Sequence, residues 1–585
     1  MKRFAALAIA AGLVTASCSG HGGSSSMLPL GSGTQSGSQS TKTTALAAAP
    51  AGWANTHTQA LNIINASDLG VASATQSIAV RVGLALHNQS QLVSAVASGQ
   101  QVDDGTFIAT YAPKSSEVSA VTSYLSSQGL TGITVDSNNL LVSASGTIAQ
   151  VQKAFNTSIH SYSGSGTSFI ANISPAYVPS SLGGIVVAVL GLNNLQAVKP
   201  TPKVTSCQVF GVSTPPQECL RFYDPATFQV AYHAGSTPIA SNTPVAIMAE
   251  GDPTQSISDF RLNEQKFGLP QVPVNRIQVG VPSTDTGGAT EWTLDMTYSS
   301  GIAQAVKAIY LYTTTSLTDS DITLEYNKWV TQHYTNIGNS SFGGCEFFPY
   351  LDGSMLLDDE ILLEGASHGQ TMFASSGDNG GYCNNFVNTN GAPGGAPFVM
   401  YPAASPYVAA VGGTDLFSNA DGTYKGESAW EAGGGGLSQF EYSPYWEQKA
   451  QPVSQNVSSL RGVPDVAMDA SLETGAELWG GNAVNGSCTP CVTGGTSLAS
   501  PLSAGVWARL QSAHGNKLGF APVWYYNNFT QHAAGAVNAG PPPWQPDGGF
   551  HDILSGTNGL YTAAPGYDYT TGLGSFDIAI LNGQV

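Results

Sequence analysis

Two patterns of apolar and polar residues alternate along the C-terminal part of the chain. Short runs that are apolar throughout predict buried strands, and longer segments with apolar residues three and four positions apart predict helices. The expected strands are Val245–Ala249, Arg276–Val279, Ala308–Tyr312, Asn336–Ser340 and Met372–Ser375, and the expected helices are Ser256–Phe267, Glu291–Ile302, Asp321–Gln332 and Met355–His368. Because strands and helices alternate, the pattern predicts an α/β fold in which helices cover both faces of a parallel sheet.

The pattern differs between residues 56 and 194. Strands are expected at Phe107–Tyr111, Ile133–Val135, Leu140–Val142 and Ile185–Leu192, with helices at Ser115–Gln128 and Thr147–Phe155. Two strand-helix-strand units in succession predict a ferredoxin-like α+β domain. A proline-containing loop, residues 195–221, follows, and the large domain is expected to cover residues 222–585. The loop is the expected processing site, since proteolytic nicking concentrates in exposed loops.

The N-terminus has the pattern of an export signal. A basic start, Met1-Lys2-Arg3, precedes the apolar run Phe4–Val14, which is too short to span a membrane as a helix. Residues 1–18 are therefore predicted as a signal peptide, and its last four residues, Thr15 to Cys18, resemble a bacterial lipoprotein box except at Thr15. Residues 19–55, rich in Ser, Gly and Thr, are predicted as a flexible tether. We expect a secreted protein, or one lipid-anchored at Cys18 to a bacterial cell envelope.

Cysteine usage agrees with export. Setting Cys18 aside leaves six of the seven cysteines, and an exported chain permits three disulfides between them. Proximity in the sequence suggests the pairs Cys207–Cys219, Cys345–Cys383 and Cys488–Cys491, although the sequence alone leaves the connectivity open. A redox or metal role for Cys488 and Cys491 is the alternative, but no second Cys or His pair accompanies them.

The net charge of the chain argues against one class of binding partner. The formal net charge is −19, with only 19 Lys and Arg residues, and 10% of the chain is charged. Phosphates would be repelled, so we expect no nucleic-acid partner. Because few residues are charged, few ion pairs are lost when acid protonates carboxylates, which suits a protein that works in acid. We expect a monomer.

Ser497 lies in a crowded segment of small residues, Thr493–Pro501, just before an expected helix at Leu502–Ser512. A serine at a helix N-terminus lies near free N–H groups that can hold an oxyanion, although such a serine can equally be a simple helix cap. A nucleophilic serine needs a base. None of the ten histidines lies in a motif typical of a catalytic base.

Three carboxylates are better placed than the histidines. Glu291 and Asp295 stand four positions apart and share one helix face, where a solvated helix surface is the alternative. Asp378 follows the predicted strand Met372–Ser375, where ligands gather in parallel sheets, although Asp-Asn-Gly alone would also form a turn.

These motifs, in this order, resemble the sedolisin family of serine-carboxyl peptidases over nearly the whole chain beyond the leader. The marks are Glu291-x-x-x-Asp295, Ser376-Gly377-Asp378, Gly494-Gly495-Thr496-Ser497 and Gly566-Tyr567-Asp568, supported by Ser341-Phe342-Gly343-Gly344, Val411–Thr414, Gly433–Gly436 and Arg461–Val466. Gly494 departs from the family, which usually has serine there. The resemblance implies a subtilisin-like fold, a pro-kumamolisin-type activation domain at residues 56–194, and protein or peptide substrates.

The resemblance also implies catalytic roles. Ser497 would attack the scissile carbonyl, Glu291 would take its proton, and Asp295 would hold Glu291, while a protonated Asp378 would donate to the oxyanion. Because Glu291 must be ionised while Asp378 is protonated, we expect maximal activity roughly between pH 3 and 5. The activation domain would inhibit the enzyme as its own propeptide until acid protonated carboxylates at the interface and the linker was cut.

A structural calcium ion is also implied by the resemblance. Its ligands would be the Asp552 and Asp568 side chains and the carbonyls of Ile553, Ala564 and Gly566, which are the hard oxygens that Ca²⁺ prefers. Without the resemblance, two turn aspartates would be the simpler interpretation.

Two other functions are weighed against the peptidase. A catalytically weak sedolisin-like binding protein of the envelope would be favoured by the loss of a catalytic position, but all four are present. A neutral subtilisin would need a histidine motif that the sequence lacks.

Overall fold

The computed structural model describes residues 48–584 except 62, 64–65, 165–166, 197–202, 206–222, 384–396, 451–457, 481, 484–485, 488–489 and 534–547. The predicted signal peptide, the lipoprotein box, nearly all of the tether and the Cys207–Cys219 pair lie outside these residues. Among the described helices, none is both long and apolar enough to cross a membrane.

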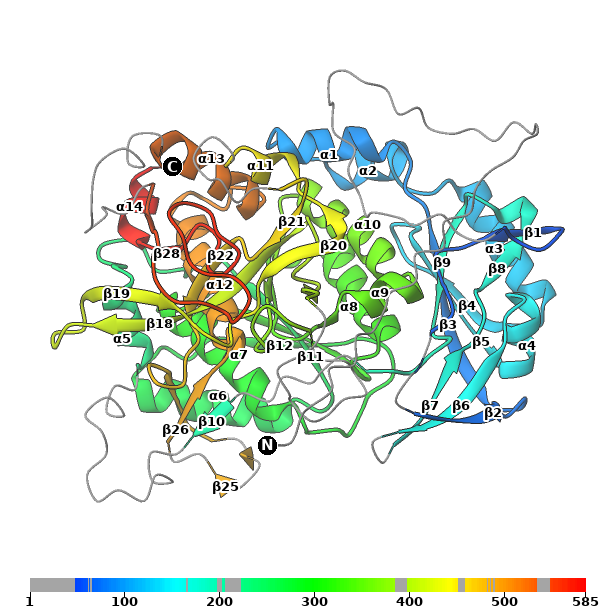
Figure 1. Ribbon diagram of the computed structural model, residues 1–585, viewed down its shortest axis with the longest axis horizontal. Coiled ribbons are helices and arrows are strands. Elements are labelled where there is room, and N and C mark those ends of the chain that lie inside the picture. The colour runs from blue at the N-terminus through cyan, green and yellow to red at the C-terminus, as the bar shows by residue number, and fades with distance from the viewer. Residues whose placement is uncertain are drawn as a thin grey trace, which may run out of the picture. The chain divides into compact units, whose positions relative to one another are not determined.

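The large domain is built on an eight-stranded sheet, of which β11, β12, β18, β19 and β22 are labelled in Figure 1. Seven strands follow the order β12-β13-β11-β14-β16-β18-β19, and β22 also pairs with β18. All pairs are parallel except β18–β19. The strands are β11 Val245–Glu250, β12 Val274–Gln278, β13 Ile309–Thr314, β14 Ile337–Ser340, β16 Thr371–Ser375, β18 Val408–Ser418, β19 Tyr424–Ala429 and β22 Val466–Asp469. The five predicted strands all lie in this sheet, so the predicted α/β fold is confirmed.

The predicted helices of the large domain are also present. They are α6 Thr254–Phe267, α7 Ala289–Ile302, α8 Asp319–Gln332 and α10 Ser354–Ser367, and α12 Thr496–Ala513 begins beside the candidate nucleophile. Helix α7 has no solvated face, because every one of its residues is buried. At Gly505 of α12 an added Cβ would lie 2.3 Å from the Ser299 carbonyl oxygen of α7. Glycine therefore permits the close approach of these two helices.

Shorter elements complete the large domain. They are α5 Pro225–Ala231, α9 Phe347–Asp352, α11 Tyr445–Gln448, α13 Ala521–Ala533, α14 Ile578–Gly583, β15 Gly344–Cys345, β17 Met400–Tyr401, β20 Gly436–Tyr442, β21 Leu460–Val463, β23 Ala476–Leu478, β24 Asn482–Ala483, β25 Gly486–Ser487, β26 Cys491–Gly494, β27 Phe550–His551 and β28 Ser575–Phe576. The linker contributes β10 Lys203–Thr205, which pairs antiparallel with β26.

The N-terminal domain has its own sheet and core. Its four antiparallel strands follow the order β4-β5-β3-β9, and with α3 and α4 they make the predicted ferredoxin-like arrangement. A second sheet has the order β2-β6-β7. The elements are β1 Trp53–Asn55, β2 Ser67–Val71, β3 Ser77–Leu84, α1 Gln89–Ala97, α2 Asp104–Thr110, α3 Ser115–Ser127, β4 Thr131–Val135, β5 Leu141–Thr147, α4 Ile148–Ala154, β6 Ile159–Gly164, β7 Thr167–Asn172, β8 Tyr177–Pro179, the 3-10 turn Ser180–Leu182 and β9 Val186–Leu190.

The strand predicted at Phe107–Tyr111 is wrong, since these residues belong largely to α2. Asp103 caps the helix by accepting a hydrogen bond from the Thr106 amide at 3.0 Å. Phe107 is the one buried residue of α2. The first strand of the ferredoxin-like unit is instead β3, which precedes α1 and α2.

Buried polar groups join the N-terminal domain to helices of the large domain. Arg81 donates to Ser320 at 2.9 Å and to the Asp321 carboxylate at 3.1 Å, both on α8. Asn138 donates to Asn327 of α8 and to Glu364 of α10, each at 2.6 Å. The N-terminal domain therefore presents donors to carboxylates and amides of the large domain.

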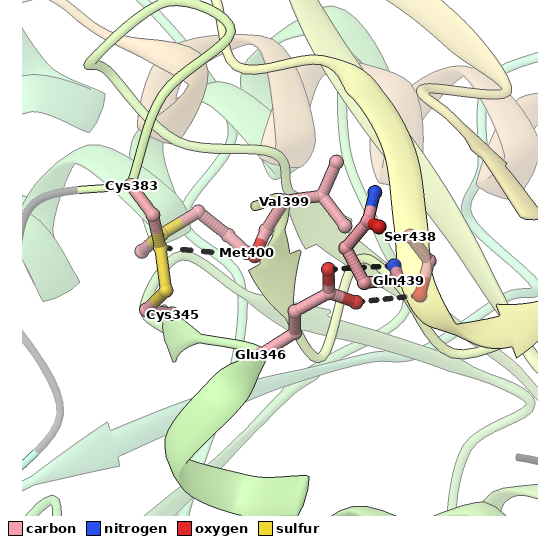
Figure 2. Close-up of a disulfide and its surroundings, with 7 residues drawn as sticks. All are labelled: Cys345, Glu346, Cys383, Val399, Met400, Ser438 and Gln439. Carbon is pink, nitrogen blue, oxygen red and sulfur yellow. Dashed lines mark hydrogen bonds between the residues drawn. A yellow bond between two sulfur atoms is a disulfide. The ribbon is translucent and has the colours of Figure 1, made fainter. Parts of the chain in front are cut away.

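The predicted disulfide Cys345–Cys383 is present (Figure 2). Cys345 lies in β15, and the carboxylate of the next residue, Glu346, accepts hydrogen bonds from the Ser438 hydroxyl and the Gln439 amide. The bond therefore links the segment after β14 to the segment after β16. Cys491 is also disulfide-bonded, while Cys488 lies outside the described residues.

Candidate active site

The nucleophile candidate lies where β26 turns into α12. Gly495 has φ 104°, a left-handed conformation that favours glycine, and an added Cβ would lie 2.6 Å from an Asp378 carboxyl oxygen. Ser497 is the second residue of α12 and is buried, and its Oγ donates to the Ser341 carbonyl at 3.4 Å. The turn therefore holds Ser497 at the helix N-terminus, as its sequence predicts.

Gly494, the departure from the family pattern, has a local explanation. An added Cβ at this position would lie 2.5 Å from the Ala470 carbonyl oxygen and 3.2 Å from the Leu472 amide nitrogen. In this chain the backbone of that neighbouring segment occupies the space that a serine side chain would need.

Glu291 and Asp295 belong to the interior of the molecule and not to a solvated helix face, since both side chains are fully buried. Burial raises the pKa of Glu291 well above its usual value, the charges of Asp295 and Asp378 raise it further, and the nearby Ser497 hydroxyl lowers it. Burial likewise raises the pKa of Asp295, while the hydrogen bond from Ser341 and the nearby Asn339 amide lower it. The fold thus brings the two carboxylates and the serine together.

The Ser497 hydroxyl and the Glu291 carboxylate are neighbours without a formed hydrogen bond. Ser497 donates to the Ser341 carbonyl, and neither carboxylate oxygen of Glu291 has a hydrogen-bond partner. Catalytic hydrogen bonds are often long before a substrate binds, so this geometry is compatible with Glu291 as a base.

Asp378 is fixed against the residue that precedes the nucleophile. Its Oδ1 accepts hydrogen bonds from the Thr496 amide at 2.7 Å and the Thr496 hydroxyl at 2.9 Å. The Thr496 hydroxyl in turn accepts from the Gly377 amide at 3.0 Å, and Gly434 donates to the Gly377 carbonyl at 2.6 Å. Asp378 lies past the carboxyl end of β16, as predicted, and contributes to the site rather than to an isolated turn.

The candidate calcium ligands gather around one C-terminal loop. Asp552 accepts from the Gly566 amide at 3.0 Å, and Asp568 accepts from the Ala564 amide at 2.9 Å. The two carboxylates lie on one loop and offer oxygen ligands, the type that Ca²⁺ prefers. No group of three His, Cys, Asp or Glu side chains among the described residues is arranged to hold a metal, so backbone carbonyls would have to complete any such site.

Sequence reasoning missed one set of residues around the site. Ser341 begins the supporting motif Ser341–Gly344, and its hydroxyl donates to Asp295 at 2.7 Å. Asn339, which lies in none of the motifs, donates to Ser341, and Ser500 in turn donates to Asn339. The Ser341–Asp295 and Ser500–Asn339 contacts join residues far apart in the sequence, so local patterns carry little signal for them.

The chain is similar to known proteins along most of its length. Residues 65–195 match the family model for the pro-kumamolisin activation domain, and residues 282–538 match that of the subtilase family. Sedolisin from Pseudomonas sp. (strain 101) is 34% identical over 92% of this chain and 94% of its own length. Xanthomonalisin from Xanthomonas sp. (strain T-22) is 34% identical over 89% of this chain and 67% of its own length.

A solved structure is similar as well. Pseudomonas sedolisin, described as a serine-carboxyl proteinase complexed with two molecules of pseudo-iodotyrostatin, aligns with a TM-score of 0.55 at 34% identity. The alignment covers 62% of this chain and 97% of that one.

Proposed function

The chain belongs to the sedolisin family of serine-carboxyl peptidases, and on that premise we propose that it is an acid-acting endopeptidase that uses Ser497, Glu291 and Asp295 as its triad. The observation that carries the proposal is the complete burial of Glu291 and Asp295 beside Ser497. Two such carboxyls in one fully buried helix are unfavourable for folding alone. Perturbed carboxyls next to a nucleophile are typical of an active site.

The proposed mechanism follows from these positions. Ser497 Oγ attacks the scissile carbonyl, Glu291 takes the hydroxyl proton, and it then gives that proton to the leaving amine. Water releases the acyl group by the reverse proton path. The Ser497 amide and a protonated Asp378 donate to the oxyanion. Because Asp378 Oδ1 accepts from Thr496, the donated proton belongs on Oδ2.

The buried carboxyl pair explains why acid is the proposed working range. Burial alone would keep both carboxyls protonated in acid. A proton shared between two close carboxyls, together with the hydrogen bond from Ser341 to Asp295, stabilises a single negative charge on the pair there. That charge accepts the serine proton where a histidine, with an ordinary pKa of about 6.5, would already be protonated. Asp378 sets the opposite limit, since it acts as a donor only while it holds a proton.

The triad is tested by cleavage of an acid-denatured protein by wild-type enzyme, Ser497→Ala and Glu291→Gln. Both variants should lose about a thousandfold or more in turnover, because each removes a group without which proton transfer fails. Near-normal activity of Glu291→Gln would show that another group is the base.

The N-terminal domain supports the proposal that the chain is made as a zymogen. The linker that follows this domain lies close to the candidate nucleophile, Ser497. Strand β10 pairs antiparallel with β26, so Lys203 lies opposite Gly494, and the chain reaches Ser497 three residues later. We propose that the linker, residues 195–221, is cut by the enzyme itself. Purified Ser497→Ala protein should then stay full-length on acidification, whereas normal processing of this variant would indicate another protease.

We also propose the structural calcium ion at Asp552, Asp568 and the carbonyls of Ile553, Ala564 and Gly566. Its charge would tie the C-terminal loop together, and it takes no part in the reaction. The hydrogen bonds of both carboxylates to amides of that loop support the proposal. Export through the N-terminal signal, with or without lipid at Cys18, is proposed from the sequence alone.

A further inference from the structure

Three polar side chains form a continuous hydrogen-bonded chain that ends on Asp295. Ser500 of α12 donates to the Asn339 carbonyl oxygen Oδ1 at 2.7 Å. Asn339 of β14 donates through Nδ2 to Ser341 Oγ at 3.0 Å. Ser341 then donates to Asp295 Oδ1 at 2.7 Å. Of these four residues only Asp295 is ionisable, and all four are almost completely buried.

The direction of this chain is fixed by its chemistry. Because Ser341 Oγ accepts from the Asn339 amide, its own proton is directed to the carboxylate, and because Asn339 Oδ1 accepts from Ser500, its Nδ2 faces Ser341. Each bond polarises the next in the same sense, which strengthens donation to a negative charge at the end. The three residues together therefore favour the ionised form of Asp295.

The same residues connect Asp295 to the nucleophile. The Ser341 carbonyl accepts from Ser497 Oγ at 3.4 Å, and Ser500 lies one helical turn after Ser497 on α12. Asn339 lies in a central strand, between β11 and β16. The chain thus spans α7, β14 and α12, the three elements that set the distance between Glu291 and Ser497.

We propose that Ser341 is a positioning residue for the peptidase reaction, with Asn339 and Ser500 supporting it, and that it stabilises the single negative charge of the Glu291–Asp295 pair. The inference rests on the proposed triad. Without the donated hydrogen bond, the pair would bind its second proton at higher pH. The acidic limb of the rate profile would then move to higher pH, because the doubly protonated pair cannot accept the serine proton.

The test compares kcat/KM on a peptide substrate from about pH 2 to 7 for acid-activated wild-type, Ser341→Ala, Ser341→Thr and Ser500→Ala enzymes. Ser341→Ala should shift the acidic limb to higher pH by about one unit, the size expected for one hydrogen bond to a charged group. Ser500→Ala should raise it by less, and Ser341→Thr, which keeps the hydroxyl, should restore the wild-type limb.

Ser503→Ala is the matched control. Ser503 is also buried on α12, but its hydroxyl donates to the Ala499 carbonyl at 2.9 Å and takes no part in the chain. Its acidic limb should match that of the wild type. An unchanged limb in Ser341→Ala and Ser500→Ala, even with lower rates at every pH, would overturn the inference. If Ser341→Ala does not fold, the comparison of Ser500→Ala with Ser503→Ala decides.

The two proposals fail in different ways. A wild-type enzyme without an acidic limb would contradict the proposed triad, whatever the variants do. A wild-type acidic limb that stays unchanged in Ser341→Ala and Ser500→Ala would contradict only the positioning role of Ser341.

Discussion

At the scale of single residues, replacing Asp378 distinguishes its proposed role as oxyanion donor from the role of Glu291 as base. Asparagine can donate the same hydrogen bond but does not titrate, so Asp378→Asn should flatten the alkaline fall in kcat/KM while leaving the acidic limb in place. The absolute rate should drop, because an amide N–H is a weaker donor to an oxyanion than a carboxyl O–H, although the amide oxygen can still accept from Thr496. The measurement is the pH dependence of kcat/KM. An alkaline limb as steep as in the wild type would assign that limb to another group.

The candidate catalytic residues could be predicted from the sequence because each lies in a local motif with its own chemistry. The motif Gly494–Ser497 is an example. Gly495 adopts the positive φ that the turn before Ser497 needs, and Thr496 donates the hydrogen bond that fixes Asp378 against that turn. The role of Ser341 could not be predicted in this way. Its contact with Asp295 spans 46 positions and depends on how β14 meets α7.

At the scale of elements, the apolar pattern predicted strands buried on both faces but failed where a short run was ambiguous. Residues 107–111 contain enough apolar side chains for a strand, and the Asp103 cap decides in favour of helix α2. Helix α7 shows a related limit. Its sequence leaves a solvated face open as the alternative, yet the helix is buried all round, so Glu291 and Asp295 are interior groups.

The C-terminal loop, residues 552–568, gives a prediction at the same scale. Removing calcium with a chelator at working pH should lower the melting temperature of the mature domain, because Asp552 and Asp568 would then repel each other across the loop. Elemental analysis should find about one calcium per chain if the proposed ligand set is right. An unchanged melting temperature together with no bound metal would rule the site out.

At the scale of the whole molecule, acid acts in two directions on the contacts between the N-terminal and large domains. Glu360 of α10 accepts a hydrogen bond from the Leu86 amide at 3.3 Å, and burial raises its pKa from 4.5 to about 8. A buried carboxyl with a raised pKa stabilises the assembled form while it is protonated, and that stability is lost as pH rises through the raised value. Acid therefore favours the burial of Glu360, whereas the Arg81–Asp321 ion pair is a contact that acid weakens.

Glu360→Gln tests this sign. In full-length Ser497→Ala protein, which cannot cut itself, thermal stability should fall between pH 4.5 and about 8. Adding Glu360→Gln, which mimics the protonated carboxyl, should flatten that fall and leave stability at acidic pH unchanged. A steeper fall in the variant would mean that Glu360 is ionised in the zymogen, and that acid releases the domain through this contact. On the present account, cleavage of the linker rather than protonation of Glu360 starts the release.

The central claim is that carboxyls, and no histidine, run the peptidase chemistry. The most direct test is the pH profile of kcat/KM for the mature wild-type enzyme on a peptide substrate. The account predicts a bell with its maximum roughly between pH 3 and 5 and little activity at neutrality, since an ionised Glu291–Asp295 pair and a protonated Asp378 coexist only in acid. A maximum at or above about pH 7, where a histidine base works, would contradict it.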